Sequence, residues 1–107
     1  MALEIEKNNN SVLKIAGTTI ELNLIYARIN FTFDRNGADS YGKLYLYNSK
    51  SLFESNPNDL LVLDDFSTQH TFTIDTNVEE QSLETGHQKL KEWLENLGYI
   101  VTIVDLN

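Results

Sequence analysis

Apolar and polar residues alternate along much of the first two thirds of the chain, as they do in β-strands that cover a core with one face. The longest such run is residues 19–34, TIELNLIYARINFTFD. Its apolar residues fall on even positions up to Leu24 and on odd positions from Ile25 onward. Because side chains on a strand have a period of two, this change of phase predicts a bulge, or a strand that crosses between two packing surfaces.

Shorter runs of the same kind come before and after it. Four of them predict further strands, at residues 12–16, 43–48, 60–65 and 69–75. Between the two longest strands, Asn36 and Gly37 form a pair that readily adopts the positive φ values of a tight turn, which predicts a hairpin. Residues 49–55, SKSLFES, start with a serine suited to an N-cap and predict a single helical turn.

The periodicity becomes helical in the last third of the chain. Four leucines and a histidine recur there every three or four positions and form one stripe along a helix: Leu83, His87, Leu90, Leu94 and Leu97. Asn77 and Glu80 have the spacing of a capping box, and Gly98 is placed to end the helix, so we predict an amphipathic helix over residues 78–97. The final run, YIVTIVDL, is apolar on both faces apart from Thr102, which predicts an interior strand or one whose faces are both covered.

These elements predict an α+β fold, with an antiparallel-dominated β-sheet or small sandwich and one C-terminal amphipathic helix followed by a final strand. At 107 residues the chain has room for one domain with one core, which we assign to residues 11–107. Residues 1–10 end in a polar NNN run. We expect them to form an edge strand, or an arm that contacts a neighbouring molecule through Leu3 and Ile5.

The charge and cysteine content exclude several classes of function. The formal net charge is −8, from 16 acidic and 8 basic residues, and such a surface repels nucleic-acid phosphates and anionic membranes. The chain has no cysteine, which excludes disulfides, zinc–thiolate sites, iron–sulfur clusters and thiol nucleophiles. No apolar run is long enough to cross a bilayer, and the first residues lack the apolar segment of a secretory signal, so we expect no signal-directed secretion.

The sequence ETGH, residues 84–87, is the first candidate for chemistry, because a carboxylate three residues before a histidine on a helix is half of a di-metal site. A complete site needs a second such pair and two further carboxylates from other helices. Glu84 would also point about 60° away from the apolar stripe that contains His87. His70, the other histidine, is on a separate predicted strand. We therefore predict that His87 is packed structurally, and that the chain binds no metal or other cofactor.

Two acidic stretches have simpler explanations than catalysis. Asp34, Asn36 and Asp39 surround a glycine as in a calcium loop, but the bidentate glutamate of such a loop is missing, so we predict a charged turn. Asp64 and Asp65 are neighbours on a predicted strand and would point to opposite faces, away from any shared substrate atom. The serines and glycines match no nucleophile or phosphate-loop motif. We predict that the chain is not an enzyme.

Three tyrosines share one side of the strand predicted around residues 43–48: Tyr41, Tyr45 and Tyr47. Aromatic side chains on an exposed strand stack on bases or sugars, or form an interface with another protein. The scarcity of interleaved basic residues argues against stacking on bases. An interface and a second packed layer are equal alternatives for these tyrosines.

Three segments resemble, in their order and layout, small virion-associated proteins of tailed bacteriophages: IYARINFTFDRNG, YLYNSKSLFES and HQKLKEWLENLGYIVTIVDL. The shared layout is strands, a short Ser-Lys-x-x-Phe turn, more strands, then a helix that ends in Leu-Gly-Tyr and a final strand. The resemblance implies a structural or interaction component of a phage particle, made in the host cytoplasm and located in the virion. Its partners would be other virion proteins or its own copies, within a larger assembly.

The acidity of the chain supports one alternative function, a small inhibitor of a host factor that acts by surface mimicry. Assembly predicts contacts with neighbouring chains, whereas mimicry predicts acidic residues gathered on one face.

Overall fold

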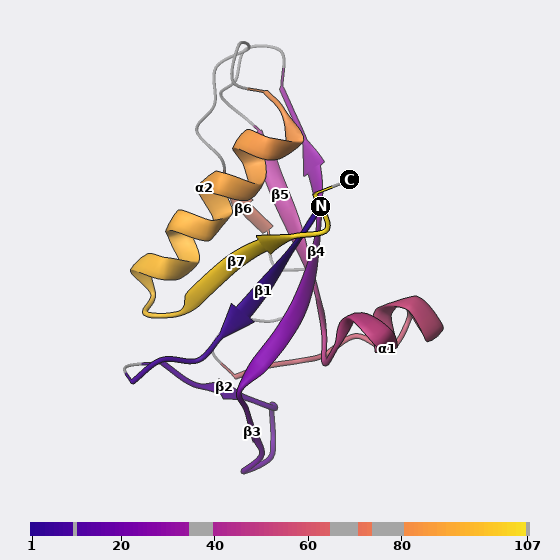
Figure 1. The fold of residues 1–107 in the computed structure, drawn as a ribbon, viewed down its shortest axis with the longest axis vertical. Helices are drawn as coiled ribbons and strands as arrows, with labels where there is room; N and C mark the ends of the chain where they lie inside the picture. The colour runs from indigo at the N-terminus through magenta and orange to yellow at the C-terminus, as the bar shows by residue number, and fades with distance from the viewer. Residues whose placement is uncertain (10, 35–39, 65–70, 74–80, 107) are drawn as a thin grey trace.

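The computed structural model describes residues 1–9, 11–34, 40–64, 71–73 and 81–106. Its elements, in chain order, are β1 (Ala2–Glu6), β2 (Leu13–Lys14), β3 (Glu21–Leu22), β4 (Leu24–Thr32), β5 (Tyr41–Tyr47), α1 (Lys50–Ser55), β6 (Thr71–Thr73), α2 (Leu83–Asn96) and β7 (Ile100–Val104) (Figure 1). Neither of the two helices described has the length and apolar character needed to span a membrane.

Five of the described strands form one sheet in the order β6-β5-β4-β1-β7, and every neighbouring pair is antiparallel. Strands β2 and β3 form a separate antiparallel pair. Helix α2 packs against one face of the larger sheet, and β7 follows it (Figure 1). The predicted fold class is therefore confirmed: the protein is α+β, with an antiparallel sheet, a C-terminal helix and a final strand.

The core lies between the sheet and α2. Alternate residues of four strands line it: Leu3, Ile5, Ile25, Ala27, Ile29, Leu44, Leu46 and Val101. From the helix, Leu90 and Leu94 cover these residues and are 2% and 0% exposed. The period-two pattern of the strands and the helical spacing of the leucines thus place the two apolar surfaces face to face.

The change of phase at Leu24 marks the passage from one sheet to the other. Residues up to Leu22 belong to the β2–β3 pair, and β4 begins at Leu24 in the larger sheet. The run predicted as one strand is thus two strands, β3 and β4, which belong to different sheets, and Leu22 packs against the same core as Ile25. The predicted hairpin turn at Asn36 and Gly37 lies outside the described residues, and β4 and β5, which flank it, pair antiparallel.

Strand β1 is an interior strand of the sheet, with β4 on one side and β7 on the other. Leu3 pairs with Ala27 and Ile103, and both Leu3 and Ile5 are 0% exposed. The prediction of an arm or edge strand at residues 1–10 was therefore wrong. The physical reason is pairing between distant segments, because β4 and β7 each form a ladder with one side of β1.

The last strand shows the opposite discrepancy. The apolar character of β7 on both faces predicted an interior strand, or one whose faces are both covered. Among the described strands β7 lies at the edge, with β1 as its neighbour, and Ile100 and Thr102 are exposed. Residues 60–65 and 69–75 were predicted as strands as well. In their described parts, residues 60–64 contribute the isolated bridge Ile15–Leu63, and residues 71–73 form β6.

Helix α2 is shorter than predicted because Ser82 caps it. The Ser82 hydroxyl oxygen accepts a hydrogen bond of 3.1 Å from the amide of Thr85, so the helix starts at Leu83. The predicted capping box, Asn77 and Glu80, lies outside the described residues. Gly98 follows the C-cap with φ +102°, as predicted for a glycine that ends a helix.

The apolar stripe of α2 is also shorter than its leucines suggested. Its buried residues are Gly86, His87, Leu90 and Leu94. Leu83 and Leu97 are 59% and 48% exposed, since they lie at the two ends of the helix. Helix α1 has the single-turn character predicted for residues 49–55, and the Ser49 hydroxyl oxygen accepts a hydrogen bond of 3.1 Å from the Leu52 amide.

Candidate functional site

The two faces of the larger sheet differ in what covers them. Helix α2 packs on one face, whereas on the opposite face α1 and residues 57–60 lie beside part of β4 and β5. We call this second side the open face. The strand register there places Arg28 beside Tyr45 and Asn30 beside Lys43. These are the positions on β4 and β5 that alternate with the core residues.

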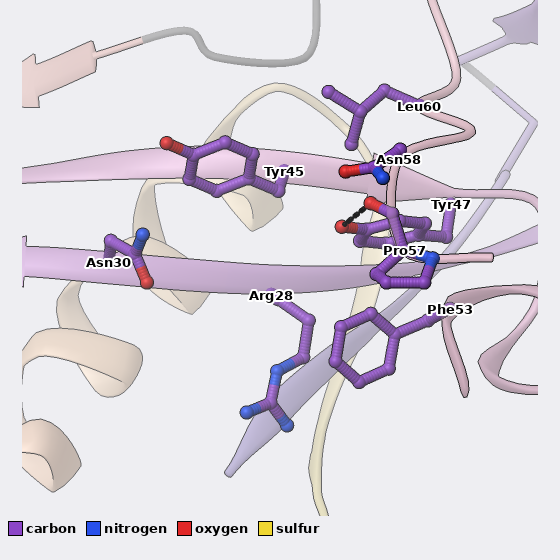
Figure 2. Close-up of a pocket in the computed structure, with 8 residues that line it drawn as sticks. All are labelled: Arg28, Asn30, Tyr45, Tyr47, Phe53, Pro57, Asn58 and Leu60. Atoms are coloured by element: carbon purple, nitrogen blue, oxygen red, sulfur yellow. Dashed lines mark hydrogen bonds between the residues drawn. The ribbon is translucent and has the colours of Figure 1, made fainter. Parts of the chain in front are cut away.

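A groove of about 460 Å³ lies on the open face. Its residues come from β4, β5, α1 and the segment that follows α1: Arg28, Asn30, Tyr45, Tyr47, Phe53, Pro57, Asn58 and Leu60 (Figure 2). We call it the aromatic groove. Its combination of apolar rings with a few polar groups is typical of surfaces that recognise a ligand or a peptide.

Tyr47 and Phe53 hold the groove in shape. Tyr47 is 4% exposed, and its hydroxyl donates a hydrogen bond of 2.8 Å to the carbonyl oxygen of Pro57 (Figure 2). Phe53 meets the Tyr47 ring edge to face, with ring centroids 5.0 Å apart. Burial raises the pKa of Tyr47 above its ordinary value of 10.0, so the hydroxyl remains a donor at neutral pH.

Arg28 supplies positive charge to the groove. Its Cζ lies 4.9 Å from the centre of the Phe53 ring, a distance at which a guanidinium and an aromatic ring attract each other. No carboxylate of the described residues forms an ion pair with Arg28, although the chain has 16 acidic residues. The ring positions the guanidinium, which also interacts with the Tyr26 hydroxyl and partly offsets the raised pKa of Tyr26. The remaining N–H donors of Arg28 have no carboxylate partner in the described chain and can serve a ligand.

Tyr45 lies across the groove from Arg28 and Phe53, close to Asn58 and Leu60 (Figure 2). The side chain of Tyr45 is half-buried, and Lys43 Nζ lies 5.9 Å from the centre of its ring. A second cation therefore flanks the groove on this side. The arrangement places aromatic surface and hydrogen-bond donors on both sides of one shallow depression.

A polar cluster anchors the neighbouring part of the open face. The Tyr26 hydroxyl and Lys50 Nζ each donate a hydrogen bond of 2.6 Å to a different carboxylate oxygen of Asp105. The bond from Lys50 is the main cause of a lowered pKa at Asp105, and burial is the main cause of a raised pKa at Tyr26. Because Tyr26 also contacts Phe53, at 5.8 Å between ring centroids, the cluster supports the wall of the groove.

The five residues predicted at an interface separate into three groups. Tyr45 and Tyr47 line the aromatic groove, and Tyr41 is 39% exposed on the same side of β5 but outside the groove. Leu3 and Ile5 are wholly buried in the sheet, so the prediction that they contact another molecule was wrong.

Sequence reasoning did not single out Arg28, Phe53 or Asp105. For Arg28 a signal was present, because it is the one cation on the polar side of β4. Phe53 and Asp105 reach the open face from α1 and from the segment after β7. Their placement depends on contacts between distant segments, for which the local pattern contains no signal.

The ETGH residues point in different directions, as predicted. Glu84 is exposed, whereas His87 is 2% exposed and lies beneath Phe31, with ring centroids 5.1 Å apart. His87 Nδ1 is 2.7 Å from the carbonyl oxygen of Leu83. The described residues contain no group of three or more His, Asp or Glu arranged to hold a metal ion.

The remaining candidates are placed in part. Asp64 forms an exposed ion pair of 3.6 Å with Lys14. Asp65, His70 and the turn residues 35–39 lie outside the described residues.

Comparisons with protein-family models, with curated proteins and with solved structures each found no match to the chain.

Proposed function

We propose that this protein is a non-catalytic binding component that receives an extended segment of a partner protein in the aromatic groove. The observation that supports this most directly is Arg28, a cation stacked on Phe53 without a carboxylate partner in the described chain, at the side of an open groove. In an acidic protein, a guanidinium held in this way is a binding group for an acceptor from another molecule.

The chemistry of the groove defines the segment that fits it. The rings of Tyr45 and Phe53 accept an apolar or aromatic side chain, and Arg28 donates hydrogen bonds to a neighbouring carboxylate. The side-chain amides of Asn30 and Asn58 pair with backbone groups of an extended chain. Tyrosine and arginine are also the residue types that most often dominate the affinity of protein interfaces.

The setting that we propose is the particle of a tailed bacteriophage, with the protein acting as a structural or interaction component. The resemblance in layout supports this setting, and an exposed aromatic groove suits a protein that works by contact. The alternative function is that of a small acidic inhibitor, whose surface imitates a ligand of a host factor. The described carboxylates come from many parts of the chain, among them β1, β3, both helices and the segment after β7.

Binding to purified virion proteins tests the groove. We expect Arg28→Met and Tyr45→Ser each to weaken binding roughly tenfold or more, because each removes a central contact while the fold is retained. Lys7→Met is the matched control, since it removes one exposed positive charge outside the groove. Isothermal titration calorimetry gives the affinities, and thermal unfolding verifies that each variant is folded.

Equal affinities of wild type and the two groove variants would reject the groove as the binding surface. The setting has a separate test, which is mass spectrometry of purified phage particles. Presence of the protein at a fixed copy number would support a virion role, and its absence would refute that part of the proposal.

A further inference from the structure

Strand β7 has the composition of an interior strand but lies at an edge of the sheet. Its sequence, Ile-Val-Thr-Ile-Val, contains no charge and no proline, and within the described chain β1 is its one strand neighbour. Edge strands normally carry a charge, a proline or a bulge, which prevents pairing with other chains. The edge formed by β7 has none of these in its five residues, so it is open to strand addition.

Three exposed apolar residues belong to β7 or flank it in the sequence. Leu97, Ile100 and Leu106 are 48%, 44% and 69% exposed. All three lie within or next to β7 in the sequence. Single exposed leucines are ordinary. Ile100 lies in the strand itself, and it would gain a cross-strand neighbour if β7 paired with another chain.

The ladder indicates which backbone groups of β7 face outward. Lys7 N donates to Asn23 O at 3.0 Å, so the odd-numbered residues of β1 direct their backbone groups to β4 and the even-numbered ones to β7. In β7, the residues that pair with the even-numbered residues of β1 are also even-numbered. The N–H and C=O groups of Val101 and Ile103 are therefore directed to the free edge.

The β7 sequence is suited to antiparallel pairing with a second copy of itself. When two copies run antiparallel with Thr102 opposite Thr102, Val101 lies opposite Ile103 and Ile100 lies opposite Val104. Every such pair consists of β-branched residues, which pack well across strands. In this register the outward groups of Val101 meet those of Ile103, as an antiparallel ladder requires.

We propose that β7 pairs with β7 of a second copy of this chain, about a two-fold axis at Thr102, and joins two five-stranded sheets into one. The interface is distinct from the aromatic groove, so both grooves of the dimer stay open to partners. Each copy has a net charge of −8, and the copies repel each other at low ionic strength. Dimerisation should therefore strengthen as salt is added.

Cysteine cross-linking tests the register, because the chain has no native cysteine. Thr102 residues that meet at the axis form a non-hydrogen-bonded pair, with Cα atoms about 4.5 Å apart, a distance compatible with a disulfide. We expect Thr102→Cys to form a disulfide-linked dimer roughly tenfold faster than Thr32→Cys, since the pairing raises the effective thiol concentration. Thr32 is the matched control, an exposed threonine on interior strand β4.

Sedimentation of the wild-type protein over a concentration series, at low and high salt, supplies the second measurement. A reversible dimer that strengthens with salt, together with selective cross-linking of Thr102→Cys, would support the proposal. A protein that stays monomeric at every concentration would overturn it. A dimer in which Thr102→Cys cross-links no faster than Thr32→Cys would overturn it too, because the contact would then be elsewhere.

Discussion

His87 makes the helix–sheet core sensitive to acid. Its Nδ1 lies 2.7 Å from the carbonyl oxygen of Leu83, which accepts only, so Nδ1 carries the proton of the neutral ring. Nε2 is buried and has no hydrogen-bond partner in the described chain. Burial lowers the pKa of His87 below 6.5, because a second proton would place a charge in the core.

The pH dependence of stability follows from this shift. Above pH 6.5 the imidazole is neutral in both states, and its titration does not affect the free energy of unfolding. Below pH 6.5 the unfolded chain binds a proton that the folded chain does not, so stability falls until the pH passes the lowered pKa. We expect a slope of up to about 1.4 kcal/mol per pH unit in urea titrations, and its loss in His87→Leu.

Asp105 titrates in a lower range, because its pKa is lowered from 3.8. An unchanged slope in His87→Leu would mean that another group is responsible.

At the scale of the elements, the approach of α2 to β4 depends on a glycine. A Cβ at Gly86 would lie 2.6 Å from Cε1 and 2.7 Å from Cζ of Phe31. Contacts that short require the ring to move, yet Phe31 also packs against Phe33 and His87. Glycine within a helix is ordinarily unfavourable, and at Gly86, near the start of α2, it permits the helix to lie against an aromatic side chain.

We expect Gly86→Ala to destabilise the protein in spite of its better helix propensity. The gain in propensity is about 1 kcal/mol, whereas overpacking costs roughly 1–3 kcal/mol, so a net loss should appear in denaturant titrations. In a Phe31→Leu background the clashing ring atoms are gone, and the same alanine should become stabilising. An equal effect of Gly86→Ala in both backgrounds would show that Phe31 is not the cause.

At the scale of the whole molecule, the sheet is organised around β1. Ile5 pairs with Ile25 on one side and with Val101 on the other, and it is 0% exposed. We expect Ile5→Ala to lower the free energy of unfolding by about 2–5 kcal/mol, because it leaves a cavity in the core. Ile20→Ala, at a residue 55% exposed, should change it by less than about 0.5 kcal/mol.

Chemical denaturation of the two isoleucine variants measures this difference. If Ile5→Ala were as mild as Ile20→Ala, β1 would not be an integral strand in solution.

The sequence predicted what depends on local periodicity and missed what depends on distant pairing. The alternation around Ile25 and Leu44 was sufficient to identify the core side of β4 and β5, since each face of a strand repeats every second residue. The same alternation identified Tyr45 and Tyr47, which line the groove. The position of β1 was not predictable in this way, because it depends on partners from β4 and β7.

The placement of β1 has a consequence for how the protein is synthesised. β1 leaves the ribosome before the strands with which it pairs, and its pairing with β7 has to wait until Val104, which lies opposite Ala2, has been synthesised. Until then the backbone groups of β1 that face β7 have no strand partner. On its other side β1 pairs with β4, which has apolar residues on one face. A nascent chain of this kind exposes an edge that invites aggregation. The five-stranded sheet of the described chain is therefore completed only after β7 has been synthesised.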